Sequence, residues 1–178
     1  EARSGFEVAY FQGHADGWTI DGTTAAVEDG QTWVVTYSIA LDAAWVTRGA
    51  RITARSESGP REILLAADGA GAWLVNGEPA AHLDGCLDVD LESSAMTNTL
   101  PVHRLALAAG GHADAPAAYV RALDLSVARL EQAYRRIADD GPRQRYDYAA
   151  PAFGFTSRLV YDESGLVLDY PGIARRAG

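Results

Sequence analysis

The residues best suited to chemistry lie within one short segment, residues 82–90. If this segment is an extended strand, one face carries mostly leucine and valine, and the other carries His82, Asp84, Cys86, Asp88 and Asp90. Carboxylates two residues apart on a strand are about 6 to 7 Å from each other. Three kinds of site are compatible with such a face: a metal site, a glycosidase carboxylate pair and a cysteine nucleophile.

Each of these sites lacks one requirement. Metal ligands along a straight strand do not converge on one ion unless other segments contribute. Asp88 and Asp90 have nearly the separation of an inverting glycosidase pair, but such pairs face each other across a cleft. Cys86 would need His82 or His103 as its base, and no flanking signature supports either. All three alternatives stay open.

A structural interpretation is favoured for the two aspartates. A buried carboxylate is tolerated when an arginine binds it with two hydrogen bonds, and it is costly otherwise. Arg104 follows Asp88 and Asp90 closely enough to be this partner. Further candidates are Arg48, Arg51 and Arg158.

The segment Thr97-Asn98-Thr99-Leu100-Pro101 is predicted to be an ordered loop. Threonine and asparagine side chains bond nearby backbone groups, and Pro101 favours an extended Leu100. Alternation over residues 102–107 then indicates that the chain returns to a sheet. A histidine beside a strand, as His103 would be, is more often structural than catalytic.

Composition limits the class of protein. The 178 residues are 48% hydrophobic and carry a net charge of −9, which favours one globular domain over residues 1–178 and disfavours a nucleic-acid partner. All fifteen basic residues are arginine, so mechanisms that need a lysine are excluded.

The only cysteine, Cys86, cannot form an internal disulfide and favours a reducing compartment. No apolar stretch approaches the roughly 18 residues of a membrane span. A soluble, cytoplasmic protein is therefore expected. The first residue is Glu1 rather than Met, and a cleaved leader stays open as an alternative.

Hairpin signals recur along the chain. Short alternating segments are separated by turn sequences at Asp21-Gly22, Asp29-Gly30, Asp68-Gly69, Asn76-Gly77 and Glu163-Ser164-Gly165. In residues 33–41 the odd positions are all large and apolar, so one face of that strand must be buried. The pattern predicts a large curled sheet, a barrel or a roll. By periodicity alone, residues 125–138 are instead predicted to be a helix.

The aromatic residues have two open interpretations. They could line an apolar cavity for an acyl chain or a sugar ring, or they could form an ordinary core. The residues concerned are Trp18, Trp33, Tyr37, Trp45, Trp73, Phe153, Phe155 and Tyr161.

Several motifs in order suggest a family. They are Trp45-Val46-Thr47-Arg48, Gly71-Ala72-Trp73-Leu74-Val75-Asn76-Gly77, Gly85-Cys86-Leu87-Asp88-Val89-Asp90-Leu91, Thr97-Asn98-Thr99-Leu100-Pro101, Gln132-Ala133-Tyr134 and Gly165-Leu166-Val167-Leu168-Asp169-Tyr170-Pro171. Across nearly its whole length the chain resembles the bacterial putative glycolipid-binding family, formerly a domain of unknown function.

The resemblance implies an all-β or nearly all-β fold, an antiparallel spiral β-roll with at most a short helix. It also implies that the stretch around Gln132 and Tyr134 is a strand, with Leu130, Gln132 and Tyr134 on one face, and this replaces the helix expected from periodicity. The family's similarity to envelope proteins that carry lipids or lipoproteins is an analogy between folds, and fold does not fix function.

The first hypothesis is therefore a non-enzymatic binding protein for a glycolipid or other lipid-like ligand. Its candidate ligand-binding residues are Asp88, Asp90, Asn98, Arg104, Trp45, Trp73 and Tyr134. The alternatives are a hydrolase of a glycosidic or ester bond that uses Asp88 and Asp90, and a scaffold module with no ligand. No cofactor, bound metal or nucleic-acid partner is expected.

Overall fold

The computed structural model describes residues 3–177. The N-terminal half is a seven-stranded antiparallel meander in which each strand pairs with the next along the chain. Its strands are β1 (Ser4–Gly13), β2 (Gly17–Glu28), β3 (Gln31–Asp42), β4 (Thr47–Ser56), β5 (Gly59–Ala67), β6 (Trp73–Val75) and β7 (Glu78–Pro79).

Alternation and turn chemistry produce this meander. The odd-numbered residues of β3 from Trp33 to Leu41 are all buried, as predicted. Asp29 and Gly30 join β2 to β3, and Asn76 and Gly77 join β6 to β7. All four have positive φ, which a two-residue hairpin turn of type I′ requires.

The predicted turn at Asp21-Gly22 is wrong, because both residues lie inside β2. Gly22 pairs with Tyr37 on β3. A Cβ atom at Gly22 would lie 2.2 Å from the Tyr37 ring. The glycine is needed there to admit the tyrosine ring, and no turn forms.

The middle of the chain forms a three-stranded sheet with the order β11-β10-β8. It contains β8 (Asp88–Leu91), β10 (Ala117–Val120) and β11 (Val127–Leu130), and β8 runs parallel to β10. The predicted strand over residues 82–91 is wrong in its first half. Residues Ala81–Leu83 form a 3₁₀ turn, and Gly85 follows at a φ of +86°, which breaks the extended conformation.

The predicted loop at residues 97–101 and the strand at 102–107 are also wrong. Met96–Asn98 form a 3₁₀ turn that leads into α1 (Thr99–Leu105). Pro101 lies in the first turn of α1, where its missing N–H costs no helical hydrogen bond. The helix ends at Ala106, which is left-handed.

The C-terminal part is a six-stranded sheet with the order β16-β15-β14-β13-β12-β9. Its strands are β9 (His112–Asp114), β12 (Ala133–Asp140), β13 (Arg143–Ala150), β14 (Phe155–Tyr161), β15 (Val167–Tyr170) and β16 (Ala174–Arg175). Residues 125–138 contain strands and no helix. Leu130, Gln132 and Tyr134 are all buried. The hairpin predicted around Ser164-Gly165 is confirmed, since β14 pairs with β15.

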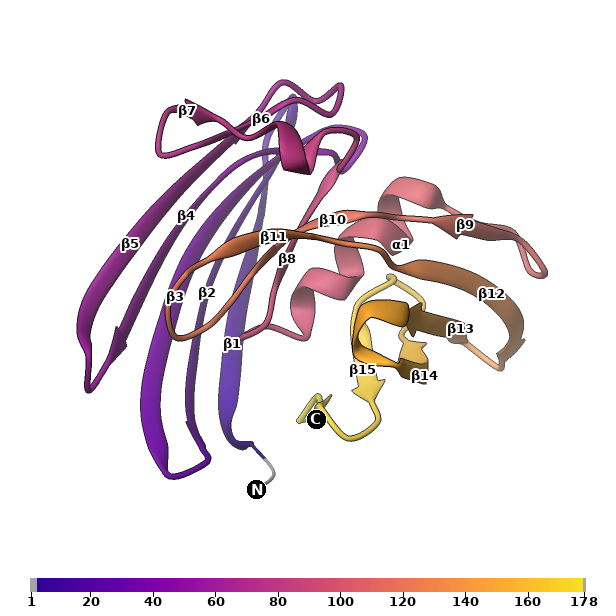
Figure 1. Ribbon diagram of the computed structural model, residues 1–178. Helices are drawn as coiled ribbons and strands as arrows, with labels where there is room; N and C mark the ends of the chain where they lie inside the picture. Colours follow the sequence, from indigo (N-terminus) through magenta and orange to yellow (C-terminus); the bar gives the residue numbers. More distant parts are fainter. Residues whose placement is uncertain (1–2, 178) are drawn as a thin grey trace.

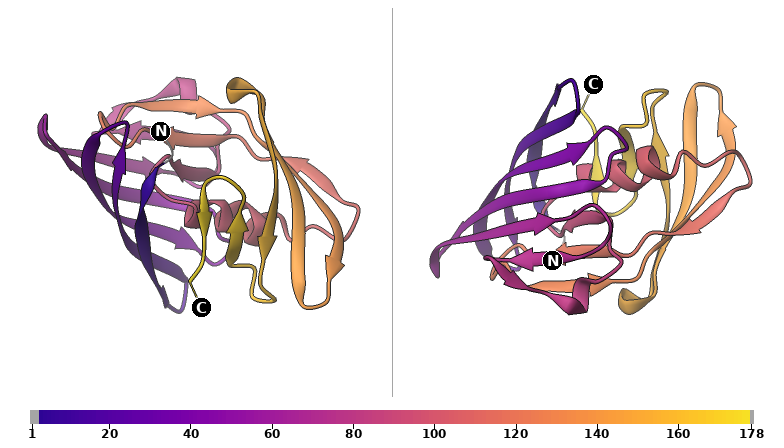
Figure 2. Two further views of the ribbon diagram at one scale, coloured as in Figure 1. Left: turned by 90° about the horizontal axis from the view of Figure 1, so that it is seen from below. Right: turned by 90° about the horizontal axis from the view of Figure 1, so that it is seen from above.

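The two large sheets lie on opposite sides of the molecule, with the three-stranded sheet and α1 between them (Figures 1 and 2). Two cores result: one under the seven-stranded sheet and a tyrosine-rich one under the six-stranded sheet. Strands hold 58% of the residues and helices 9%, so the predicted fold class, a nearly all-β curled-sheet fold, is confirmed.

Candidate binding site

Strand β8 separates the two cores. Val89 and Leu91 pack into the core under the seven-stranded sheet. Asp88 and Asp90 alternate with them and so point the other way. Asp90 pairs in register with Tyr119 of β10, which packs against the tyrosine-rich core. The predicted acidic face is therefore present at these two residues, and it is turned inward.

Asp88 forms a two-bond ion pair with Arg104. The Arg104 Nε donates to Asp88 Oδ1 at 2.9 Å, and Nη2 donates to Oδ2 at 2.6 Å. Only 1% of the Asp88 side chain and 12% of the Arg104 side chain are exposed. Burial raises the pKa of the Asp88 carboxyl, and the Arg104 guanidinium opposes this. The predicted arginine pairing is confirmed for Asp88 with Arg104.

The other arginines proposed as partners lie elsewhere, and that part of the prediction is wrong. Arg48, Arg51 and Arg158 instead pair with Asp42, Glu62 and Asp147, respectively.

Asp90 has no arginine partner among residues 3–177. Its one hydrogen bond comes from Thr97 Oγ1, at 2.9 Å from Asp90 Oδ1. The same hydroxyl lies 2.9 Å from the Ser94 carbonyl oxygen. Thr97 has only one hydroxyl proton, so its bond to Asp90 competes with its bond to the Ser94 carbonyl oxygen. Burial raises the pKa of Asp90 to about 6.

Asn98 connects this segment to the six-stranded sheet. Its Oδ1 accepts a hydrogen bond from the Tyr134 hydroxyl at 2.8 Å, and its carbonyl oxygen accepts one from the Tyr161 hydroxyl at 3.1 Å. Both tyrosines are fully buried. These bonds fix the start of α1 against β12 and β14.

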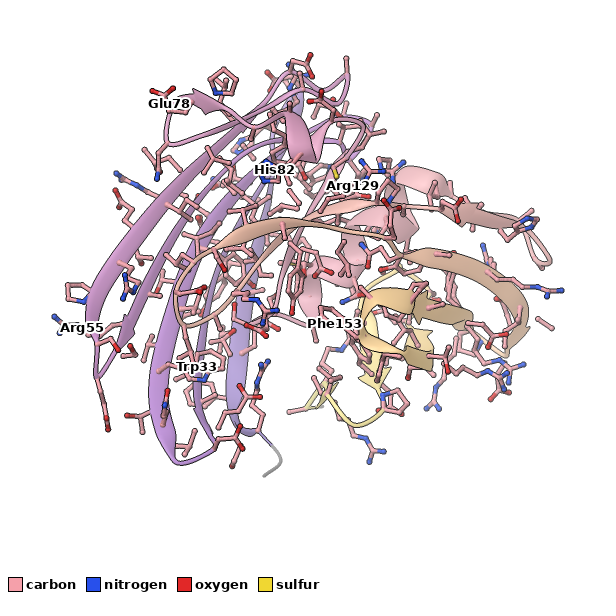
Figure 3. The ribbon with its side chains drawn as sticks, viewed as in Figure 1. Trp33, Arg55, Glu78, His82, Arg129 and Phe153 are labelled. Carbon is pink, nitrogen blue, oxygen red and sulfur yellow. The ribbon has the colours of Figure 1, made fainter. Side chains whose placement is uncertain are left out.

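A pocket of about 310 Å³ opens between the three-stranded and six-stranded sheets. Asp90, Ser94 and Asn98 form its buried polar end. Phe153 and Ile173, which are 50% and 48% exposed, form its outer end. In Figure 3 Phe153 lies between the two large sheets.

Five aromatic rings line this pocket: Tyr119, Tyr148, Phe153, Phe155 and Tyr170. The ring of Tyr148 lies 6.2 Å from Phe155 and 6.0 Å from Tyr170. Tyr119 and Phe153 are 5.5 Å apart. Burial, and after it the charge of Asp90, raises the pKa of Tyr148 and Tyr170. Their hydroxyls therefore stay protonated.

Of the seven predicted ligand-binding residues, Asp90 and Asn98 line the pocket. Trp73 is 2% exposed, and its Nε1 donates to the Cys86 carbonyl oxygen at 2.8 Å. Trp45 stacks on His103, with ring centres 3.7 Å apart.

The sequence analysis missed Tyr119, Tyr148 and Tyr170. Tyr146 and Tyr148 alternate along β13, which signals a buried face. That alternation does not by itself signal a pocket.

The metal and cysteine alternatives find no support in the geometry. No group of three His, Cys, Asp or Glu side chains that could hold a metal ion occurs within residues 3–177. Cys86 is buried, and this burial raises the pKa of its thiol to about 11. A thiol this hard to ionise is a poor nucleophile near neutral pH.

A larger depression of about 930 Å³ lies on the opposite face of β12, β13 and β14. Its side chains are largely solvent-facing, and its Asp147 pairs with Arg158 at 3.0 Å. Because this surface is open, the smaller and more enclosed aromatic pocket is the better candidate site.

The fold and pocket define a β-roll with an aromatic pocket between its sheets. A sequence-family model described as "Putative glycolipid-binding" matches residues 1–176, and the chain belongs to this family. It is also similar to the crystal structure of a DUF1089 family protein from Pseudomonas aeruginosa. The identity is 35%, the TM-score is 0.82, and the match covers 96% of this chain and 92% of the other.

No curated protein matches the chain. Within residues 3–177, no helix combines the length and the hydropathy needed to cross a membrane.

Proposed function

We propose that the protein is a non-enzymatic binding protein for a glycolipid or a similar lipid-like amphiphile. The head group lies in the aromatic pocket and the apolar chain leaves through its mouth. The observation that carries this proposal is the change in polarity along the pocket. Asp90 and Asn98 are buried at the inner end, whereas Phe153 and Ile173 are about half exposed at the outer end.

The size of the pocket agrees with this arrangement. Small-molecule pockets typically have volumes of about 300 to 1,000 Å³, and this one has about 310 Å³. It accommodates one compact head group, so a long chain must extend past Phe153 and Ile173. Aromatic rings present broad apolar faces to a sugar ring or an alkyl chain. The family's description supports a glycolipid as the class of ligand.

The hydrolase alternative requires both Asp88 and Asp90 to reach a bound ligand. Asp88 is 0% exposed and is bound by Arg104. It does not line the pocket, so the pair of Asp88 and Asp90 that this alternative uses cannot flank a ligand bond there. The pure scaffold alternative predicts no pocket at this position. The geometry therefore favours binding.

The test is a calorimetric titration with octyl β-glucoside below its critical micelle concentration. Phe153→Ala should weaken binding about three- to tenfold, because the lost ring contact contributes about 1 kcal/mol. The matched control is Tyr10→Ala, which removes a 71% exposed ring from β1, away from the pocket. It should bind as the wild type does.

Two results would contradict the proposal. One is the absence of glucoside binding together with the absence of any lipid in mass spectra of organic extracts from the native protein. The other is an equal loss of affinity in Tyr10→Ala and Phe153→Ala.

A further inference from the structure

We propose that the head group bound in this pocket is an organic ammonium ion, with Asp90 as its counter-ion and the surrounding tyrosine and phenylalanine rings as its cage. This inference rests on the proposed function, because it names the head-group class at the same pocket. The pocket thus selects a positively charged amphiphile over a neutral one.

The first argument is that no cationic side chain within residues 3–177 pairs with Asp90. Its neighbour Asp88 shows how this protein neutralises a buried carboxylate, with two bonds from Arg104. Asp90 receives one bond, from the neutral Thr97 hydroxyl. An ionised carboxylate buried in this way is costly unless a positive charge comes to it. Since Asp90 lines the pocket, a ligand can supply that charge.

Arg3, at the rim of the pocket, is already engaged. Its Nη1 donates to the Glu92 carbonyl oxygen at 2.7 Å, and its Nε and Nη2 donate to Glu28 Oε2 at 3.2 and 3.1 Å. Its guanidinium also lies 5.0 Å from the centre of the Trp33 ring. These hydrogen bonds use the Arg3 guanidinium, and none of them goes to Asp90.

The second argument is the ring cage. A cation within about 6 Å of an aromatic ring centre is attracted by the negative face of the ring. Five aromatic rings, among them Tyr148, Phe155 and Tyr170, line the pocket that Asp90 also lines. The Tyr148 hydroxyl donates its proton to Gln132 Oε1 at 2.9 Å. A phenolic oxygen that donates its proton keeps lone pairs that can accept a hydrogen bond from an ammonium N–H.

The third argument is the charge around Asp90, which disfavours an anionic head group. Two further carboxylates, those of Asp88 and Glu92, lie near Asp90 on its own segment. The nearby Arg104 of α1 is already bound to Asp88. The tyrosines that face it come from five other strands. They are Tyr119, Tyr134, Tyr148, Tyr161 and Tyr170. With Arg3 occupied, these groups present no free positive charge to a phosphate, sulfate or carboxylate.

The experiment compares three amphiphiles that share an octyl tail: octylammonium, octyltrimethylammonium and octyl β-glucoside. Each is titrated below its critical micelle concentration at pH 8 and pH 5. At pH 8 both ammonium ligands should bind at least tenfold more tightly than the glucoside. Their affinity should fall about tenfold at pH 5, where about a tenth of Asp90 is ionised, because its pKa is raised to about 6. Glucoside binding should not change.

Two variants identify the group responsible. Asp90→Asn should remove the ammonium preference and its pH dependence. Asp147→Asn removes one exposed carboxylate on the far side of the six-stranded sheet. It should keep the preference, which controls for general attraction of cations to a chain of net charge −9.

The outcomes separate this inference from the proposed function. Equal binding of all three ligands by the wild type, or an ammonium preference that survives in Asp90→Asn, overturns the inference and leaves amphiphile binding intact. Binding of none of the three overturns the inference, and it overturns the proposed function too if organic extracts of the native protein contain no lipid. Either order of affinity between the two ammonium ligands supports the inference. If Asp90→Asn does not fold, an ammonium preference in the wild type that is the same at pH 5 and pH 8 overturns it.

Discussion

Replacing Asp90 with asparagine should stabilise the unliganded protein at pH 8 and have little effect near pH 4. The asparagine Oδ1 can accept the same hydrogen bond from Thr97, and the side chain keeps its shape. What the substitution removes is the cost of a buried, unpaired negative charge.

The expected size follows from the pKa of Asp90, which burial raises from 3.8 to about 6. This rise in pKa means that folding favours the protonated form of Asp90 over the ionised form by about 3 kcal/mol. The folded chain binds this proton more tightly than the unfolded chain. The resulting stability is therefore fully present below pH 3.8 and is lost as the pH rises through about 6. Asparagine does not titrate, so it avoids this loss.

Urea denaturation of the wild type and Asp90→Asn between pH 4 and pH 8 measures the effect. The difference in unfolding free energy should grow by about 2 to 3 kcal/mol in favour of the variant over this range. Asp147→Asn, on an exposed ion pair, is the control and should show no comparable growth. A difference that stays flat with pH, or a variant less stable than the wild type at pH 8, would refute the reasoning.

Three other predictions concern the packing around the site. Arg104→Met should cost about 3 to 5 kcal/mol of unfolding free energy, because it leaves Asp88 buried and unpaired, and adding Asp88→Asn should recover part of this in urea denaturation. Tyr134→Phe should cost about 1 to 3 kcal/mol in the same assay, since it leaves the buried Asn98 Oδ1 without its donor; no loss would show that water replaces the hydroxyl. Cys86 should react with a thiol reagent at pH 8 only as fast as the protein opens, because it is buried and its pKa is raised to about 11, and rapid labelling of the native protein would contradict this packing.

The sequence predicts the fold well where local chemistry and burial agree. The alternation in residues 33–41 predicts a strand, and Asn76-Gly77 predicts a hairpin turn. The structure has both. Gly22 shows where this reasoning fails. Its neighbour Asp21 completes a turn signal, but the glycine is there to admit the ring of Tyr37 from the next strand.

Residues near Pro101 show a second limit. Proline favours an extended residue before it, yet in the first turn of a helix it costs no hydrogen bond, and the sequence does not decide between these effects. Likewise, the helical spacing of Leu130 and Tyr134 belongs to two short strands that the chain joins at Gln132. The resemblance to a family resolved that ambiguity, which periodicity alone did not.

The candidate site could be predicted only in part. Asp88 and Arg104 are close in sequence and carry complementary charges, so their pairing was foreseeable. The pocket rings come from residues 119 to 170, on separate strands and one turn. These rings come together only because the six-stranded sheet packs against the three-stranded one. No local sequence pattern predicts that packing.

The most direct test of amphiphile binding in the aromatic pocket is NMR with protein labelled at phenylalanine and tyrosine. Intermolecular nuclear Overhauser effects are measured from the octyl chain and head group of bound octylammonium or octyl β-glucoside. The account predicts contacts from the head group to Tyr148 and Tyr170 and from the chain to Phe153. Contacts confined to the exposed Phe6 and Tyr10 of β1, or no contacts at saturating ligand, would contradict it.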